Sequence, residues 1–239
     1  MDTLINIWQS MVGLLGSAGA SAGGVLNANT RTMDMAQLLA LAAAMGWASG
    51  LRLYLVLFIA GVAGLLGWIP LPAGLQVLQH PAMLAGSAFM LFVEFFADKI
   101  PGVDSLWDIV HSVIRVPAGA ALAAGVFGAD SATMGTVAGV LGGALAAMSF
   151  ATKASTRAAV NTSPEPFSNI AVSLLEDGAV MGAMWLATHY PIAFGITLFI
   201  ILVLSIWLLV VLVKYLRAIL RRISGWLGGD GITKAAPSR

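Results

Sequence analysis

The feature that most constrains this chain is a run of apolar residues from Ile192 to Val213 that contains no charged side chain. As a helix it would be about 33 Å long, enough to cross a hydrocarbon core of about 30 Å. A helix satisfies all its backbone groups internally, which a single strand in hydrocarbon does not. A second apolar stretch, from Met35 to Trp68, would be about 50 Å long as one helix, more than one crossing requires. The chain is therefore expected to be a helical membrane protein.

The composition supports this class and excludes several others. Hydrophobic residues make up 59% of the chain and charged residues only 10%, against about a quarter charged in soluble domains. The net charge of +1 argues against nucleic acid as a partner. The absence of cysteine excludes disulfides, thiolate catalysis and cysteine-bound metals. No serine-hydrolase, zinc-protease or nucleotide-binding motif is present, so we do not expect an enzyme.

The predicted fold is all-α, a polytopic transmembrane helix bundle of about six to seven membrane segments. Met35 to Trp68 is divided at Ser49-Gly50, and its first part is either a short span or a re-entrant segment. The predicted segments are 35–49, 51–68, 82–98, 114–129, 133–152, 168–187 and 191–213.

Outside the transmembrane domain (35–213), three further regions are predicted. Residues 1–34 are expected to form an interfacial helix followed by a Gly/Ala/Ser-rich linker. Residues 214–227 combine Lys and Arg with apolar residues, which is typical of a basic amphipathic helix on the cytoplasmic face. Residues 228–239 are expected to be a disordered tail.

The basic residues predict the orientation. With the C-terminus in the cytoplasm, the inner connections contain every basic residue between 35 and 213, and the outer connections (69–81, 130–132, 188–190) contain none. Because Lys and Arg are retained on the cytoplasmic side, this distribution supports seven segments and an external N-terminus.

A short internal similarity suggests a repeat. The stretch Ala43–Ser49 matches Ala146–Thr152, and an arginine follows each copy. Both copies run in the same direction, which predicts parallel repeats of three segments with 114–129 as a linker helix. The match is short and rich in alanine, so chance is the alternative.

Acidic residues gather where the 82–98 segment ends. Four of the eleven acidic residues lie between 94 and 108, and two more lie about two turns into the 168–187 segment. A carboxylate at such depth is costly and usually functional; the alternative is that each one simply pairs with a cation. The predicted ion- or substrate-binding residues are Glu94, Asp98, Asp104, Asp108, Glu176 and Asp177, with helix capping as the alternative for Asp104.

The residues predicted to pair with these carboxylates, or to gate access to them, lie on the inner connections. They are Arg52, Lys99, Lys153, Arg157 and Asn161. Opposite charges at one depth in a membrane protein are expected to meet. We therefore expect Arg52 and Arg157 to approach the carboxylates in a single polar vestibule near the cytoplasmic face.

No cofactor is predicted, and the metal question stays open. Many oxygen ligands, three histidines and no cysteine would suit a divalent cation such as Mg²⁺, Ca²⁺ or Mn²⁺ better than Zn²⁺ or Cu²⁺. His111 lies near the acidic face and is either a proton acceptor or a polar anchor.

Three motifs together resemble a bacterial polytopic membrane family catalogued as domain of unknown function 4126. They are Gly46-Trp47-Ala48-Ser49-Gly50-Leu51-Arg52, the stretch Glu94 to Asp108, and Lys153-Ala154-Ser155-Thr156-Arg157 with Asn161 to Pro166. The resemblance covers roughly 35–187 and implies a bacterial inner-membrane protein without an established activity. Glu94 to Lys99 is also similar to the Glu-x-Gly-Asp-Lys motif of cation/proton exchangers, although it has one extra residue and no glycine.

Two functions from different classes follow. The first is an integral membrane transporter of a small solute or ion, coupled to cations or protons through its membrane-embedded carboxylates. The second is a non-transporting membrane scaffold or lipid-binding module. Membrane lipids are expected partners in both cases, and the oligomeric state is open.

Overall fold

The computed structural model describes residues 33–100, 102–128, 131–161 and 166–227, and these residues form helices without any strand. The predicted all-α, polytopic transmembrane bundle is therefore confirmed. Residues 1–32 of the predicted interfacial helix and linker (1–34) and the predicted tail (228–239) lie outside the described residues. The elements are α2 (Met35–Leu65), η1 (Ala73–Gln79), α3 (Pro81–Ala97), α4 (Val103–Phe127), α5 (Ala132–Val160), α6 (Pro166–His189) and α7 (Pro191–Leu227).

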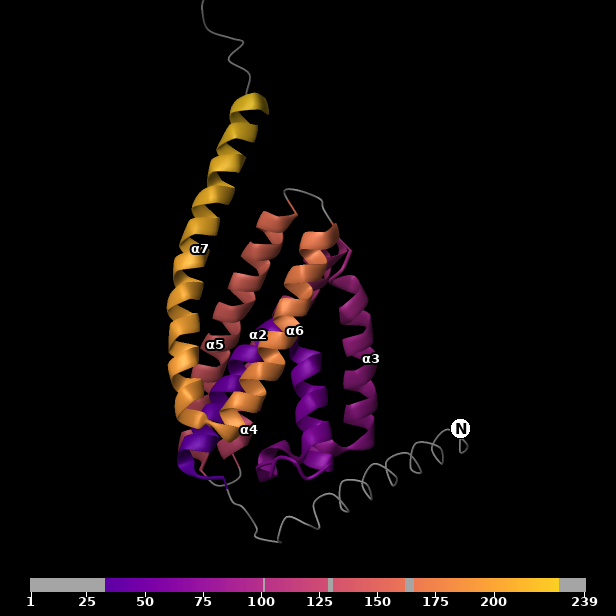
Figure 1. Cartoon of the computed structure of the whole chain (residues 1–239), viewed down its shortest axis with the longest axis vertical. Coiled ribbons are helices and arrows are strands. Elements are labelled where there is room, and N and C mark those ends of the chain that lie inside the picture. The colour runs from indigo at the N-terminus through magenta and orange to yellow at the C-terminus, as the bar shows by residue number, and fades with distance from the viewer. Residues whose placement is uncertain (1–32, 101, 129–130, 162–165, 228–239) are drawn as a thin grey trace, which may run out of the picture.

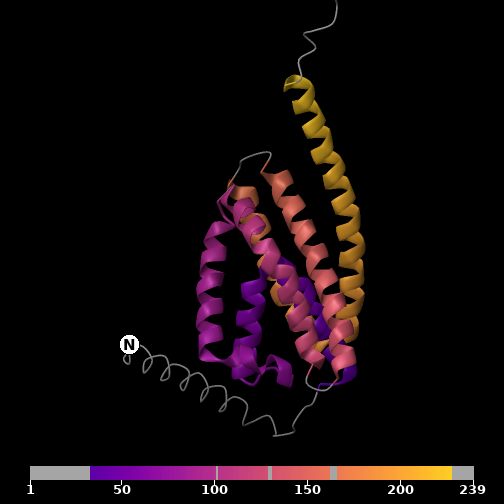
Figure 2. The same cartoon turned by 180° about the vertical axis from the view of Figure 1, so that it is seen from behind.

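Helix α2 is broken at Arg52, whose φ of −142° and ψ of 73° are not helical. The helix begins with a capping box in which Asp34 and Gln37 bond each other's backbone N–H groups. Figures 1 and 2 show that the chain rises from Met35 to the break and then descends to Leu65. Both ends of α2 therefore lie at the end of the bundle that also holds η1. The two parts are called the first arm (35–51) and the second arm (53–65).

Each arm of α2 is shorter than the hydrocarbon core of a bilayer is thick. At 1.5 Å per residue the arms are about 25 Å and 20 Å long, whereas the hydrocarbon core is about 30 Å thick. The break comes close to the predicted division at Ser49-Gly50. The predicted full-span alternative for 35–49 is not what the structure shows, because the chain turns back inside the bundle. We call α2 a re-entrant hairpin with Arg52 at its apex.

The remaining helices alternate in direction around this hairpin (Figures 1 and 2). Among the described residues, α4, α5, α6 and α7 are each long and apolar enough to cross a membrane, and α2 would be so only if its two arms formed one straight helix. The bent pair of η1 and α3 would be a sixth candidate. The two arms of α2 together with α3 to α7 correspond to the seven predicted segments. The chain is therefore a multi-pass membrane protein.

The first arm of α2 packs closely against α5 because glycines face each other. A Cβ atom built on Gly46 would lie 2.6 Å from the Cα of Gly142, so no side chain fits between the two backbones. At the apex, Ser149 and Lys153 of α5 donate to the carbonyls of Trp47 (2.6 Å) and Leu51 (3.1 Å). These bonds satisfy backbone groups at the broken end of the arm, which hydrocarbon could not do.

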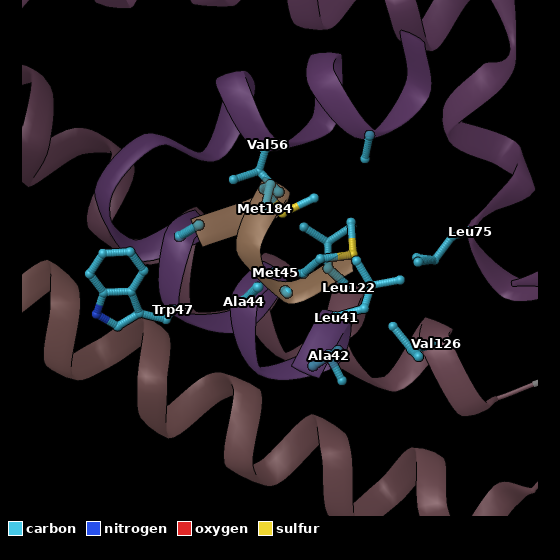
Figure 3. Close-up of a cluster of buried hydrophobic side chains, with 14 of the residues drawn as sticks. Leu41, Ala42, Ala44, Met45, Trp47, Val56, Leu75, Leu122, Val126 and Met184 are labelled. Carbon is cyan, nitrogen blue, oxygen red and sulfur yellow. The ribbon is translucent and has the colours of Figure 1, made fainter. Parts of the chain in front are cut away.

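The apolar core surrounds both arms of the hairpin. Leu41 and Met45 of the first arm belong to the same buried cluster as Val56 of the second arm. Figure 3 shows them together with side chains from α4 and α6, among them Leu122 and Met184. The core thus holds the apex of α2 at a defined depth in the bundle.

Three predicted boundaries are wrong in an informative way. Helix α4 begins at Val103 rather than near 114, and α5 continues to Val160 rather than ending near 152. The polar residues at these ends lie on one buried face, so low hydropathy there does not mean a loop. The basic segment 214–227 is the continuation of α7 and not a separate helix, because no residue interrupts the helix after Val213.

The predicted three-segment repeat stays a prediction. Its two best-matched stretches, 43–49 and 146–152, do lie side by side and run in the same direction, as the contact of Gly46 with Gly142 and that of Gly50 with Ala146 show.

Candidate functional site

Arg52, at the apex of α2, is fully buried and binds groups from two other helices. Its Nη1 donates to Asp98, which caps the C-terminus of α3. Its Nη2 donates to the hydroxyl of Ser173 on α6 at 2.6 Å, and its Nε lies 2.9 Å from Asp177 Oδ1. A buried guanidinium needs such partners to offset its lost hydration. Arg52 therefore ties the apex of the hairpin to α3 and α6.

Asp98 is the point at which three cations meet. Besides Arg52, Lys153 Nζ lies 3.2 Å from Asp98 Oδ2, and Arg157 donates to the carbonyl of Asp98 at 2.8 Å. Positive charges on three sides of one carboxylate favour its ionised form over its protonated form.

Arg115 on α4 organises the second part of the cluster. Its two terminal nitrogens lie 2.6 Å from Glu94 on α3 and 2.7 Å from Asp108 on α4. Asp108 is in turn 3.2 Å from Lys153, which connects this part to Asp98. Lys153, which lies on α5, thus connects the ion pairs at the end of α3 with those of α4.

The third part of the cluster centres on Glu176 of α6. Its Oε2 lies 3.1 Å from Arg157, 3.5 Å from Lys153 and 3.6 Å from Arg52. Arg157 also lies 3.8 Å from Asp104 on α4. The prediction that Arg52 and Arg157 approach the carboxylates is therefore confirmed in its geometry. One network connects α2, α3, α4, α5 and α6.

Amide groups cover the network at the end where α5 finishes and α6 begins. Asn161 donates to both carboxylate oxygens of Asp104 at 3.0 and 3.1 Å and to the Ser105 hydroxyl at 3.0 Å. Asn169 donates to the side-chain oxygen of Asn161 at 2.9 Å. Asp104 also accepts from the N–H groups of Gly102 and Ser105. Asp104 thus lies inside the first turn of α4, and Gly102 is the N-cap.

Lys99 is the predicted pairing residue that stays outside the network. Its Nζ donates to the carbonyl of Phe95 at 3.0 Å and lies 3.0 Å from the centroid of the Phe95 ring. Partial burial, reinforced by Arg52, lowers the pKa of Lys99 below its ordinary value. Lys99 therefore lies at the rim of the site.

The buried network carries more negative than positive groups. Four buried cations (Arg52, Arg115, Lys153 and Arg157) face six carboxylates (Glu94, Asp98, Asp104, Asp108, Glu176 and Asp177). Glu94 Oε2, Asp98 Oδ1 and Asp108 Oδ2 are buried without a hydrogen-bond partner. If all six carboxylates were ionised, two negative charges would be uncompensated in a medium of low dielectric, so a proton or a cation bound there would lower the free energy.

Among the residues that the structure describes, no group of three or more His, Asp or Glu side chains could hold a metal ion. His111 stacks on Trp107 and its Nδ1 lies 2.9 Å from the carbonyl of that residue, which fits the polar-anchor alternative. The carboxylates face Arg and Lys side chains instead.

Sequence reasoning omitted three residues from the predicted site, Arg115, Asn169 and Ser173. Spacing is the signal that could have found them. Asp104, Asp108, His111 and Arg115 follow one another at intervals of four, three and four residues, which places all of them on one helical face. Asn169 and Ser173 precede Asp177 at intervals of four in the same way.

A groove of about 450 Å³ lies beside the network, between the second arm of α2, α3 and α6. Apolar residues, among them Phe58, Phe92 and Phe95, form most of its lining. Asp177 is the one charged residue that lines it, and its side chain is 18% exposed. The groove therefore connects a lipid-facing surface to the Arg52–Asp177 pair.

Comparison with known proteins identifies the family of the chain but finds no relative whose activity is known. No curated protein and no solved structure matches the chain. The similarity of Glu94 to Lys99 to cation/proton exchangers is thus unsupported. A family model described as a domain of unknown function matches residues 39–211, which cover most of α2, all of α3 to α6 and the first part of α7. The chain therefore belongs to the family catalogued as domain of unknown function 4126.

Proposed function

We propose that this protein transports a small solute or ion across the membrane and that protons or cations drive the transport. The observation that carries the proposal is the break at Arg52, which lies inside the bundle and faces the buried ion-pair network. Transporters commonly place their sites at such discontinuous helices, where backbone and charged side chains meet near the middle of the membrane. We do not propose catalysis.

The ion pairs of the network can exchange partners. Lys153 lies within 3.5 Å of Asp98, Asp108 and Glu176, so it has three alternative carboxylates on three elements. Protonation of one carboxylate would release Lys153 toward the others. Because these carboxylates belong to different helices, such an exchange would alter how the helices are held together. This supports coupling between protonation and movement.

We also propose that the C-terminus is cytoplasmic and that the protein lies in a bacterial inner membrane. The C-terminal end of α3, which Lys99 follows closely in the chain, and the C-terminal part of α7, which includes Lys214 and Arg217, lie toward the same end of the bundle (Figures 1 and 2). At the opposite end, the described residues 33–34, 66–80, 128, 131 and 188–191 contain no Lys or Arg. Retention of basic residues in the cytoplasm supports this orientation.

The test is flux in proteoliposomes that contain the full chain. A pH gradient is imposed and internal pH is followed with a trapped dye, with mono- and divalent cations added in turn. We expect protein-dependent flux that the double variant Glu94→Gln, Glu176→Gln reduces at least about tenfold. Asp34→Asn is the matched control, because Asn also caps a helix and Asp34 lies outside the network. Flux that survives in the double variant would remove these two residues from the mechanism.

The alternative proposal is a non-transporting scaffold or lipid-binding module. It is favoured by the observation that Glu94 and Glu176 are both already paired with arginines. In that case the network would serve only to hold α2 in place. Absence of flux for every ion tested, in liposomes where the protein is folded and correctly inserted, would favour this alternative.

A further inference from the structure

The groove beside α2 combines an aromatic lining with one carboxylate. Phe58 comes from the second arm of α2 and Phe92 from α3, while Asp177 comes from α6. The volume of about 450 Å³ falls in the range of roughly 300–1,000 Å³ that is usual for small-molecule sites. Phe92 is 63% exposed, so the groove is open on the surface that faces lipid. A ligand could therefore enter from the membrane.

The charge of Asp177 determines what could bind there. Its Oδ1 contacts Arg52, and its side chain is the most exposed of the six network carboxylates for which ion pairs are seen. Asp177, the one charged residue of the lining, would repel an anionic headgroup even though Lys99 lies at the rim over Phe95, and a neutral acyl chain would use none of this charge. An organic cation would use both the carboxylate and the aromatic faces, which attract cations through their quadrupoles.

We propose that this groove binds an amphiphilic organic cation, with the charge at Asp177 and the apolar body between α2, α3 and α6. The proposal rests on the transport function proposed above and names its substrate class. Lys99 already lies over the ring of Phe95, which leaves Phe58 and Phe92 for the ligand. A bound cation would compete with Arg52 for Asp177, and Arg52 would keep Asp98 and Ser173. Binding is thereby linked to the apex of the hairpin.

The test uses tetraphenylphosphonium as the probe and tetraphenylborate, which has nearly the same shape and the opposite charge, as its control. Saturable binding of radiolabelled tetraphenylphosphonium is measured on the purified full chain in nanodiscs, without any ion gradient. Asp177→Asn removes the charge, and Ala88→Trp fills the groove. Ala183→Trp fills the separate groove between α6 and α7 and is the matched control. Thermal unfolding verifies that each variant is folded.

We expect Asp177→Asn and Ala88→Trp each to weaken binding at least about tenfold, as loss of a charge partner or of the site requires. Ala183→Trp should bind as the unsubstituted chain does, and tetraphenylborate should not compete. Binding that Ala88→Trp blocks but Asp177→Asn leaves unchanged would overturn the proposal in favour of an apolar occupant such as an acyl chain. Binding unaffected by Ala88→Trp, or no saturable binding, would also overturn it. Proton flux that depends on Glu94 and Glu176 would in those cases leave the transport function standing.

Discussion

Gly46→Ala should weaken the contact between the first arm of α2 and α5. A Cβ on Gly46 would lie 2.6 Å from the Cα of Gly142, whereas ordinary contacts begin at 3.4 Å, so the two backbones must separate by about 0.8 Å. Overpacking of this kind costs about 1–3 kcal/mol. Because the alanine Cβ has a fixed position on its own backbone and the Cα of Gly142 is a backbone atom, no side-chain rotation can relieve the overlap.

Gly86→Ala on α3 is the matched control for this substitution. A Cβ on Gly86 would have no atom within 4 Å, so the change should be neutral or stabilise the helix by up to about 1 kcal/mol. The two variants should therefore differ by about 1–4 kcal/mol in free energy of unfolding. The assay is unfolding of the purified protein in mixed micelles as the fraction of denaturing detergent rises, followed by circular dichroism. A Gly46→Ala variant as stable as Gly86→Ala would refute the close packing of α2 against α5.

Two further predictions concern the network and the hairpin. Arg115→Met should destabilise the protein by about 3–5 kcal/mol, because it leaves Glu94 without the only ion pair that the described residues give it. Adding Glu94→Gln to Arg115→Met should restore part of the lost stability, because the unpaired carboxylate is then replaced by a neutral amide. If the double variant instead lost the sum of what the two single variants lose in the same unfolding assay, Arg115 and Glu94 would not be a direct pair. The absence of cysteine makes the chain a ready background for single-cysteine labelling. Met35→Cys and Gln76→Cys should react with an impermeant maleimide from one side of the membrane and Lys214→Cys from the other; labelling of Met35→Cys from the side of Lys214→Cys would contradict the re-entrant hairpin.

Much of the candidate site could be predicted because charge is rare in this chain. Glu94, Asp98, Glu176 and Asp177 stand out in apolar segments, and the structure brings all four into the network with Arg52.

Hydropathy failed to predict helix where polar residues lie on one face of it. The first part of α4 was expected to be a connection between helices, because hydropathy averages the polar and apolar faces of a helix and the average there is low. Periodicity carries the missing information there.

The sequence by itself determined that the chain is a membrane bundle, since the apolar runs have no other stable environment and must satisfy their backbone groups as helices. It also determined that the buried charges must find one another. Only the tertiary structure decided that α2 turns back at Arg52, because the broken arm depends on Lys153 and Ser149 of a distant helix for its carbonyl partners. Packing likewise decided which carboxylate pairs with which cation. Ion pairing in a medium of low dielectric depends on distances of a few ångströms between helices, and the order of residues along the chain does not contain those distances.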